Sequence, residues 1–200
     1  YKRQIDELKN RILITLFFLI IYRLAAQVVL PGVDYNIISD AQIAGGGGLL
    51  GLLNAFTGGA FANASVVALG IMPYISASIV VQLMGVALPY LQKLQKEGES
   101  GRKKITQITR WLTIAICVVQ APAYLYGLGA LGVPDSAFVL GKGPFFIIPS
   151  VIILVTGCIF AMWLGEKITD RGIGNGISLL ITVGIIASLP LSFTQEAVSY

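Results

Sequence analysis

Long apolar runs separated by short polar and basic stretches make up most of this chain. A helix rises about 1.5 Å per residue, so about 20 apolar residues cross a hydrocarbon core of ~30 Å. The runs that reach or approach this length cover residues 12–30, 72–91, 111–128, 145–165 and 177–193. The pattern predicts an all-α polytopic membrane protein with five transmembrane helices.

One apolar region, residues 45–90, carries no charge and yet repeatedly interrupts its own helix. The interrupting residues are the glycines at 45–48, Gly51, Gly58, Gly59 and Gly70, and the prolines Pro73 and Pro89. Lipid cannot hydrogen-bond a broken backbone, so such a segment is buried in protein or lines a watery cavity. We therefore expect residues 45–70 to form a re-entrant region, a feature typical of channels and carriers.

Composition supports the membrane class and argues against catalysis. The sequence is 56% hydrophobic and 12% charged, whereas a soluble domain is about a quarter charged. There is no histidine, and Cys117 and Cys158 lie in different apolar runs, where we expect them to be buried packing residues. We predict no metal ion, no cofactor and no enzymatic activity. The chain starts at Tyr1 without methionine, so we expect a fragment of a longer protein. We also expect the run 12–30 to be retained as a span and not removed as a signal peptide.

Basic residues gather on one side of the predicted spans. Twelve of the fourteen lysines and arginines lie in the amphipathic start at 1–11 or in the loops at 92–110 and 166–176. The positive-inside rule then predicts a cytoplasmic N-terminus and an external C-terminal end. The net charge of +4 is therefore mainly a topology signal, and we expect no specific nucleic-acid partner.

Three long stretches carry a resemblance to a known family. They are GGAFANASVVALGIMPYISASIVVQLM at 58–84, KEGESGRKKITQITR at 96–110 and MWLGEKITDRGIGNGIS at 162–178. With the order and spacing of the five runs, they closely resemble the SecY family, the central channel subunits of the bacterial Sec protein translocon. The resemblance covers essentially the whole chain and implies half of an inverted-repeat channel.

The resemblance implies a function, a location and a set of partners. The expected function is passage of unfolded secretory polypeptides across the bacterial plasma (inner) membrane, and insertion of membrane proteins into it. The implied partners are a second five-span C-terminal half, the small subunits SecE and SecG, the SecA motor or the ribosome, signal peptides, nascent chains and membrane lipid. Motor docking cannot be assigned within these residues, because the family's main docking loops belong to the other half.

An apolar constriction is the first candidate site. Ile71, Ile75 and Ile79 are spaced by four residues and so share one helical stripe, and Ile177 and Ile181 repeat that spacing. The residues alone leave ordinary lipid-facing or packing isoleucines as the alternative. The resemblance implies that Ile71, Ile75, Ile177 and Ile181 contribute to a ring of aliphatic side chains around a pore.

A plug is the second candidate site. Residues 49–56 are long enough for about two helical turns and too short to span. On sequence alone, a membrane-surface amphipathic helix is an alternative for the segment 49–70. The resemblance implies a plug folded back into an external funnel, within the region 45–70. Its expected residues are Leu52, Leu53, Asn54, Phe56, Gly58 and Gly59.

A lateral gate is the third candidate site. Gln82 and Gln120 lie inside apolar runs, where an amide requires a partner, so an interhelical hydrogen bond is one interpretation. The resemblance implies that both amides, with Ile79, line a gate through which apolar segments leave for lipid.

Two polar features keep alternatives open. Arg23 lies inside the first span, where it either reaches the external interface or contacts backbone carbonyls of the plug region. The glycine-rich stretch 172–176 lacks the spacing and lysine of a phosphate-binding loop, so we expect a tight turn. Glu166, Lys167, Asp170 and Arg171 are expected to form a solvated turn before it.

Half of an inverted-repeat secondary transporter for small solutes or ions is the alternative function, because transporters also use broken helices. Coupling normally requires carboxylates or histidines inside the membrane. All ten acidic residues fall in loops or flanks, which disfavours this class.

Overall fold

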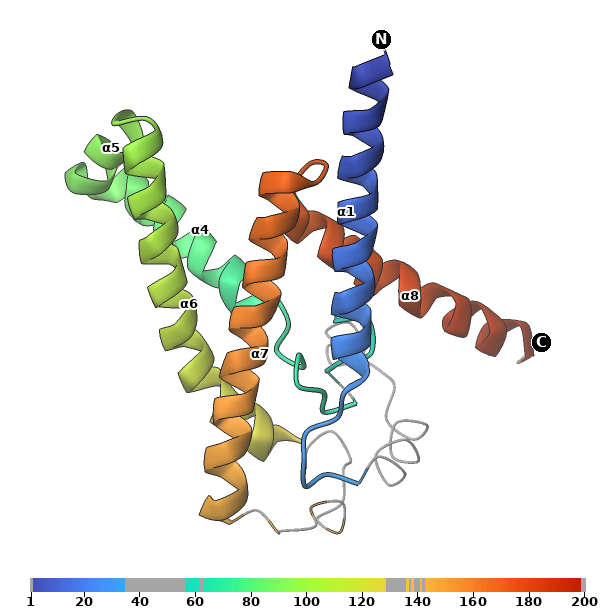
Figure 1. The fold of residues 1–200 in the computed structure, drawn as a ribbon. Helices are drawn as coiled ribbons and strands as arrows, with labels where there is room; N and C mark the ends of the chain where they lie inside the picture. Colours follow the sequence, from blue (N-terminus) through green and yellow to red (C-terminus); the bar gives the residue numbers. More distant parts are fainter. Residues whose placement is uncertain are drawn as a thin grey trace.

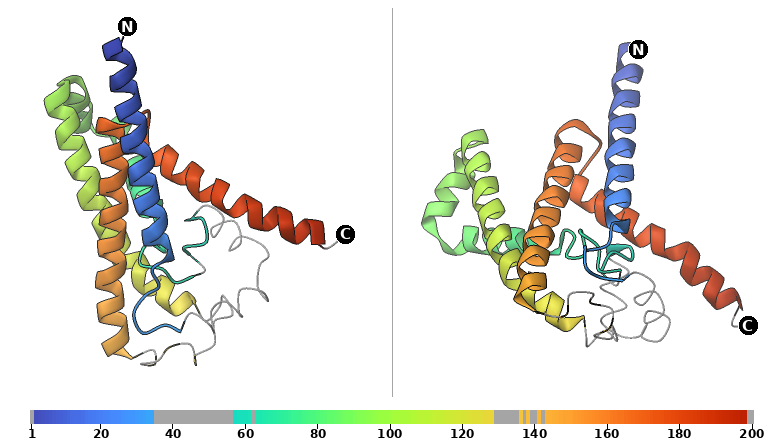
Figure 2. Two further views of the ribbon diagram at one scale, coloured as in Figure 1. Left: turned by 45° about the vertical axis from the view of Figure 1, so that its right-hand side comes forward. Right: turned by 60° about the horizontal axis from the view of Figure 1, so that its bottom comes forward.

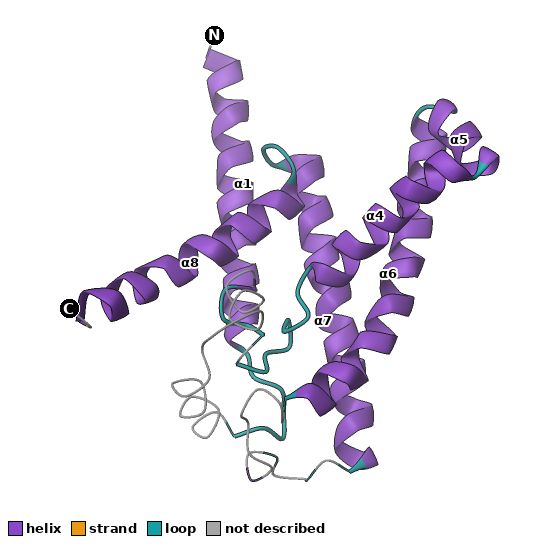
Figure 3. Ribbon diagram, turned by 180° about the vertical axis from the view of Figure 1, so that it is seen from behind, coloured by secondary structure: helices purple, strands orange, loops and turns teal. Residues whose placement is uncertain are grey.

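The computed structural model describes residues 2–34, 57–61, 63–128, 136, 138, 141 and 143–198. Within these residues the regular structure is helical, as predicted (Figures 1 and 3). The helices are α1 (Lys2–Gln27), α4 (Met72–Ala87), α5 (Pro89–Lys96), α6 (Glu99–Gly127), α7 (Pro144–Arg171) and α8 (Gly176–Val198). Strand-like pairing in this part of the chain is limited to two isolated bridges, Val29 with Ser65 and Val33 with Phe138.

The helix that starts at Met72 is shorter than the predicted span 72–91. It begins with Pro73 in its first turn, where a missing N–H costs little, and it ends at Ala87. Leu88 is extended (φ −101°, ψ 119°), and Pro89 starts α5 at 101° to α4. A residue before proline avoids helical dihedrals, so the break belongs to the Leu88–Pro89 pair.

Two other helices extend beyond their predicted spans. Residues 99–110, expected in a loop, form the first turns of α6, and residues 166–171 form the last turns of α7. The connection to α8 is therefore only 172–175, a tight turn as predicted. The basic N-terminus, α5 and this turn lie toward one end of the molecule (Figure 1), which agrees with the one-sided charge pattern.

Fewer helices are clearly long and apolar enough to cross a membrane than the sequence predicts. Among the described residues, Glu99–Gly127 and Pro144–Arg171 are each long and apolar enough to cross a bilayer. The bent pair α4 and α5 makes a third if it is counted as one broken span. The count of five therefore stays a prediction.

The helices form two packed units. Helices α4, α5 and α6 pack on one another, and so do α1, α7 and α8. The main helix contact between the α4–α6 unit and the α1/α7/α8 unit is the antiparallel pair α6 and α7 (Figures 1 and 2). We call this contact the α6–α7 seam.

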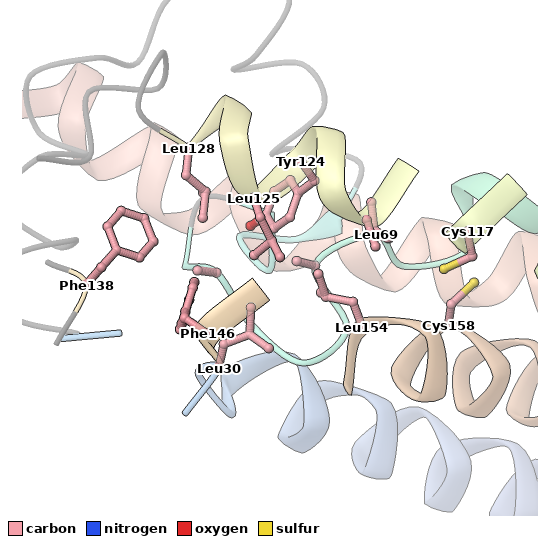
Figure 4. Packing of buried hydrophobic residues seen from close by; sticks show 13 residues of the cluster. Leu30, Leu69, Cys117, Tyr124, Leu125, Leu128, Phe138, Phe146, Leu154 and Cys158 are labelled. Atoms are coloured by element: carbon pink, nitrogen blue, oxygen red, sulfur yellow. The ribbon is translucent and has the colours of Figure 1, made fainter. Parts of the chain in front are cut away.

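The connecting segment 57–71 is buried against both units. Its backbone pairs with the residues that follow α1, since Leu30 N donates to Ala64 O (2.9 Å) and Val66 N donates to Val28 O (2.8 Å). A Cβ on Gly157 of α7 would collide with the Val66 carbonyl, so a glycine is needed for this close approach. Figure 4 shows the apolar cluster that surrounds the segment, with Leu69 between α6 and α7 side chains.

Candidate functional site

Three of the four predicted ring isoleucines line one apolar cavity. The cavity has a volume of about 200 Å³. Its lining residues come from α1, the 57–71 segment, α4 and α8, and they are Tyr22, Thr57, Ile71, Met72, Ile75 and Ile181. Residues from opposite ends of the chain thus converge on one space, which is what a shared constriction requires.

Local structure explains why these isoleucines converge. Ile71 precedes the first residue of α4, and Ile75 N donates to Ile71 O (3.0 Å), so their side chains lie one turn apart on the same stripe. Ile181 faces them from α8. All three belong to, or pack against, a buried cluster that also contains Val67, Leu164 and Leu180.

Ile177, the fourth predicted ring residue, lies behind the cavity. Its side chain packs against the same buried cluster and lies beside Gly165 of α7, where a Cβ would be 3.0 Å from Ile177 Cγ1. Ile177 therefore helps to seat α8 on α7, one turn before Ile181. It does not line the cavity as the other three isoleucines do.

Three lining residues were not among the predicted ring residues, namely Tyr22, Thr57 and Met72. Tyr22 and Thr57 are each 3% exposed, and both lie close to the position that a Cβ on Gly70 would take. Thr57 falls inside the predicted plug region, and Met72 starts the predicted second span. The sequence pattern could therefore have indicated both as site residues. Nothing in the pattern around Tyr22 distinguishes it from an interfacial tyrosine.

Arg23 contacts the plug region, as one of the two alternatives predicted. Its Nη1 donates to the carbonyl oxygen of Gly58 at 3.0 Å, and the side chain is only partly exposed. Gly58 has φ +63°, and a Cβ there would lie 2.5 Å from Arg23 Nη1 and 2.9 Å from Gly184 Cα. The turn at Gly58 is thus held between α1 and α8, where only glycine fits.

Most of the predicted plug lies outside the described residues. This applies to Leu52, Leu53, Asn54 and Phe56, whereas Gly58 and Gly59 are described. Both glycines have positive φ (+63° and +90°), a conformation that glycine adopts without strain. A second polar anchor follows at once, because Tyr124 Oη on α6 donates to Phe61 O at 2.6 Å.

The predicted gate residues are exposed on the α4–α6 unit. Ile79, Gln82 and Gln120 all face outward, on two helices that pack against each other. Gln82 Nε2 donates to Ser78 Oγ (3.3 Å) one turn back on α4, so its amide is satisfied within its own helix. The interhelical hydrogen bond considered for Gln82 is therefore replaced by an intrahelical one.

Backbone N–H groups in and next to the glycine-rich turn donate hydrogen bonds to side chains of this protein. Ile173 N donates to Thr15 Oγ1 of α1 (3.2 Å), Gly176 N to Thr169 Oγ1 (2.9 Å) and Ile177 N to Asn175 Oδ1 (3.1 Å). These contacts fasten the turn to α1 and α7. The turn is structural rather than a phosphate cradle.

Glu166 is the residue whose surroundings differ most from expectation. It was expected in a solvated turn, but it lies on α7 with a side chain only 16% exposed. Arg110 of α6 binds both of its carboxylate oxygens, with Nε to Oε1 at 2.9 Å and Nη2 to Oε2. The partner is 56 residues away in sequence, so no local pattern indicates this pair.

Metal-binding clusters are not found in the part of the chain that the structure describes. Cys117 and Cys158 are free and buried, on facing sides of α6 and α7 (Figure 4), as the sequence predicted for packing residues.

The chain matches the SecY family over residues 65–200. It is 46% identical over 189 residues to the protein translocase subunit SecY of Haemophilus influenzae. It is 44% identical over 190 residues to that of Escherichia coli K12. Each alignment covers 94% of the chain and 42% of the relative, so the chain spans about two fifths of the length of these curated relatives.

Two solved structures resemble the fold. One is described as Sec61 in the canine ribosome-channel complex from the endoplasmic reticulum, and the other as the structure of a protein conducting channel. Each gives a TM-score of 0.61 at 19% identity and covers 88% of this chain and 36% of that chain. At this identity the likeness concerns the fold alone.

Proposed function

The chain belongs to the SecY family, and from that premise we propose that it forms one half of a membrane channel for unfolded polypeptides. The observation that carries the proposal is the apolar cavity on which Ile71, Ile75 and Ile181 converge. In the complete channel these side chains form one side of a collar, and a second half supplies the other side. Ile177 supports the collar from behind.

An apolar collar suits a channel whose cargo varies. A translocating polypeptide presents every kind of side chain, and strong polar contacts at the constriction would trap some of them. Aliphatic side chains offer no such contacts, and a narrow apolar constriction resists wetting, so ions are excluded when no chain is present. Flexible isoleucine side chains can move aside for a passing segment and close again.

The cavity is too small to hold a polypeptide segment. A water molecule occupies about 30 Å³ in the liquid, so a cavity of about 200 Å³ corresponds to roughly six or seven waters. This space is far too small for a polypeptide segment with its side chains. Opening therefore requires the elements that carry the isoleucines to move apart.

The 57–61 turn is proposed to hold the base of the plug. Its carbonyls accept hydrogen bonds from Arg23 on α1 and Tyr124 on α6, so both helix units hold the segment that leads to the collar. Such an attachment is local and can be broken without unfolding a helix. We propose that residues 45–70 close the external funnel in the resting channel.

The outward face of α4 and α6 is proposed as one side of a lateral gate. Ile79, Gln82 and Gln120 are exposed there among large apolar side chains such as Leu83 and Val119. Exposed amides in this surface weaken an apolar closure against the other half. They would thereby set how hydrophobic a segment must be to open the gate.

The remaining elements of the proposal concern location and partners. We place the channel in the bacterial plasma membrane with its N-terminus in the cytoplasm, which rests on the basic residues near one end of the molecule. SecE, SecG, the C-terminal half, and a SecA motor or ribosome are the proposed partners. One of the two similar structures is a ribosome-channel complex, which supports a ribosome among these partners.

Ion conductance of the complete channel in planar bilayers tests the collar. Ile75→Gly and Ile181→Asn should each raise resting conductance, because they widen or wet the constriction. Val80→Gly is the matched control, since Val80 is an exposed residue of the same helix and does not line the cavity. Conductance that stays at the unmodified level in both collar variants would refute the proposal.

A further inference from the structure

The α6–α7 seam is the main helix contact between the two helix units. The α4–α6 unit carries Ile71, Ile75 and the proposed gate face, whereas the α1/α7/α8 unit carries Tyr22 and Ile181. The cavity lies between them, so opening it changes the position of one unit against the other. The main helix contact that resists such a change is the seam.

Most of the seam is made of small or apolar side chains. Cys117 and Ala121 of α6 and Leu154 and Cys158 of α7 belong to one buried cluster. Packing of this kind is not directional and tolerates a small shift or rotation between helices. A polar contact of defined geometry is needed to fix one arrangement.

Arg110 and Glu166 provide that contact at one end of the seam. Within the described residues, they form the one ion pair that joins two different helices. The guanidinium binds both carboxylate oxygens, and this paired geometry fixes distance and orientation together. An exposed ion pair contributes little, but here the carboxylate is largely buried, at 16% exposure against 48% for the arginine.

The pair also lies beside the collar. Tyr74 of α4 precedes Ile75 in the sequence and packs against the buried cluster that contains Ile71 and, on α7, Leu164 and Ile168. Glu166 lies between Leu164 and Ile168 in the sequence of α7. All three helices involved, α4, α6 and α7, therefore meet near the pair.

We propose that Arg110 and Glu166 are positioning residues that hold the α4–α6 unit in its closed position and so set the threshold for opening the gate. This inference rests on the proposed function. A signal segment must supply enough apolar contact to overcome the pair, and a weakened pair lowers the hydrophobicity required. Neither residue touches the translocating chain.

Export by the complete channel in cells tests this role, with two secreted reporters. One reporter carries a strongly hydrophobic signal segment and the other a weakened segment. Arg110→Gln and Glu166→Gln should each raise export of the weak-signal reporter about fivefold, the factor that corresponds to a loss of about 1 kcal/mol. Export of the strong-signal reporter should not change, because its segment already exceeds the threshold.

Charge reversal separates a positioning role from a general loss of structure. The double variant Arg110→Glu with Glu166→Arg should return weak-signal export toward the unmodified level, since the pair is restored in the opposite sense. Arg110→Lys keeps the charge but loses the two-pronged geometry, so it should raise export in the same direction by a smaller factor. Arg11→Gln and Glu7→Gln are the matched controls, because that pair is exposed within α1.

Two outcomes overturn the inference. One is weak-signal export that stays unchanged in the Gln and Lys variants, and the other is a reversal variant that behaves like the single variants. Failure of the proposed function itself looks different, because the unmodified channel would then export neither reporter.

Discussion

The two helix units differ in how they are held together. In the α1/α7/α8 unit, backbone and hydroxyl groups bond across elements, as Thr15 does with the turn at Ile173, and ten of the 28 residues of α7 are buried. In the α4–α6 unit, four of the 16 residues of α4 are buried, and large side chains such as Leu83 and Val86 face outward. Helix α1 also exposes large apolar side chains such as Phe17 and Leu24, so the units differ in their hydrogen bonds and in the burial of α7, and both present an outward apolar face. We call the α1/α7/α8 unit the support and the α4–α6 unit the wall.

The difference bears on how the proposed channel can be closed tightly and still open. The cavity takes side chains from both units, so neither unit lines it alone. The support keeps Tyr22 and Ile181 in place, while the wall carries Ile71 and Ile75. Changes that damage the packing inside the first unit should therefore mainly affect folding, and changes on the outward face of the second unit should mainly affect gating.

Gly157→Ala should have the largest effect, because it disrupts the packing of the α1/α7/α8 unit. The added Cβ would collide with the Val66 carbonyl, a backbone group that cannot rotate away. We expect a loss of about 2–3 kcal/mol in the free energy of unfolding, the upper part of the range for overpacking. Gly127→Ala on α6 is the control, because nothing lies within 4 Å of its Cβ position. Thermal unfolding of the purified complete channel measures both, and equal midpoints would contradict the assigned close contact.

Arg23→Gln should loosen the segment 57–61 between the two helix units, because it removes the hydrogen bond to Gly58 O. A hydrogen bond to a charged donor contributes about 1.5–3 kcal/mol, so its loss should speed amide exchange in residues 57–61 at least about tenfold. Hydrogen exchange followed by mass spectrometry of the purified channel provides the measurement. Lys9→Gln, an exposed change on the same helix, should leave that exchange unaltered. Slow exchange preserved in the Arg23 variant would show that the carbonyl contact is dispensable.

Tyr124→Phe removes the second hydrogen bond that holds this segment, the one donated from α6. Tyr124 is 7% exposed and donates to Phe61 O, so the change should cost about 1 kcal/mol of stability. Tyr126→Phe, at 61% exposure two residues along α6, should cost nothing measurable. Denaturant unfolding of the two variants tests the difference. A Tyr126 change as costly as the Tyr124 change would rule out the buried bond as the cause.

Gln82→Leu should have the smallest effect and should act on gating alone. The amide bonds only to Ser78 on its own helix, so stability should change by about 0.5 kcal/mol or less. An apolar residue at this exposed position strengthens an apolar closure, so a signal segment would need greater hydrophobicity. Gln120→Leu should act in the same direction. Export of reporters with graded signal segments measures the threshold, and a threshold that stays in place would exclude these amides from the gate.

Local patterns in the sequence predicted much of this arrangement. The start of α4 at Met72 follows from Pro73, the turn at Gly58 and Gly59 follows from two adjacent glycines, and the helical class follows from the apolar runs. The convergence of Ile71, Ile75 and Ile181 was expected from the resemblance, since spacing alone does not say which stripe faces a pore.

Other features depend on residues that are distant in the sequence, so local patterns could not predict them. The pairing of Arg110 with Glu166 joins two helices whose packing no local pattern reveals, so Glu166 was expected in solvent. The break at Leu88 had a local signal in Pro89, which is one of the interrupting residues, but 72–91 was still predicted as one span because it carries no charge. The role of Tyr22 in the cavity depends on how α1 packs, which composition does not determine.

The bend after Ala87 has a consequence for the surrounding lipid. With 16 residues, α4 is about 24 Å long, roughly 6 Å shorter than a typical hydrocarbon core. Helix α5 turns by 101° and bears Lys93 and Lys96, whose long side chains can reach phosphate headgroups. A short span of this kind can be accommodated by local thinning of the bilayer. In the proposed channel, a segment that leaves beside α4 would then enter a shorter stretch of acyl chains than elsewhere.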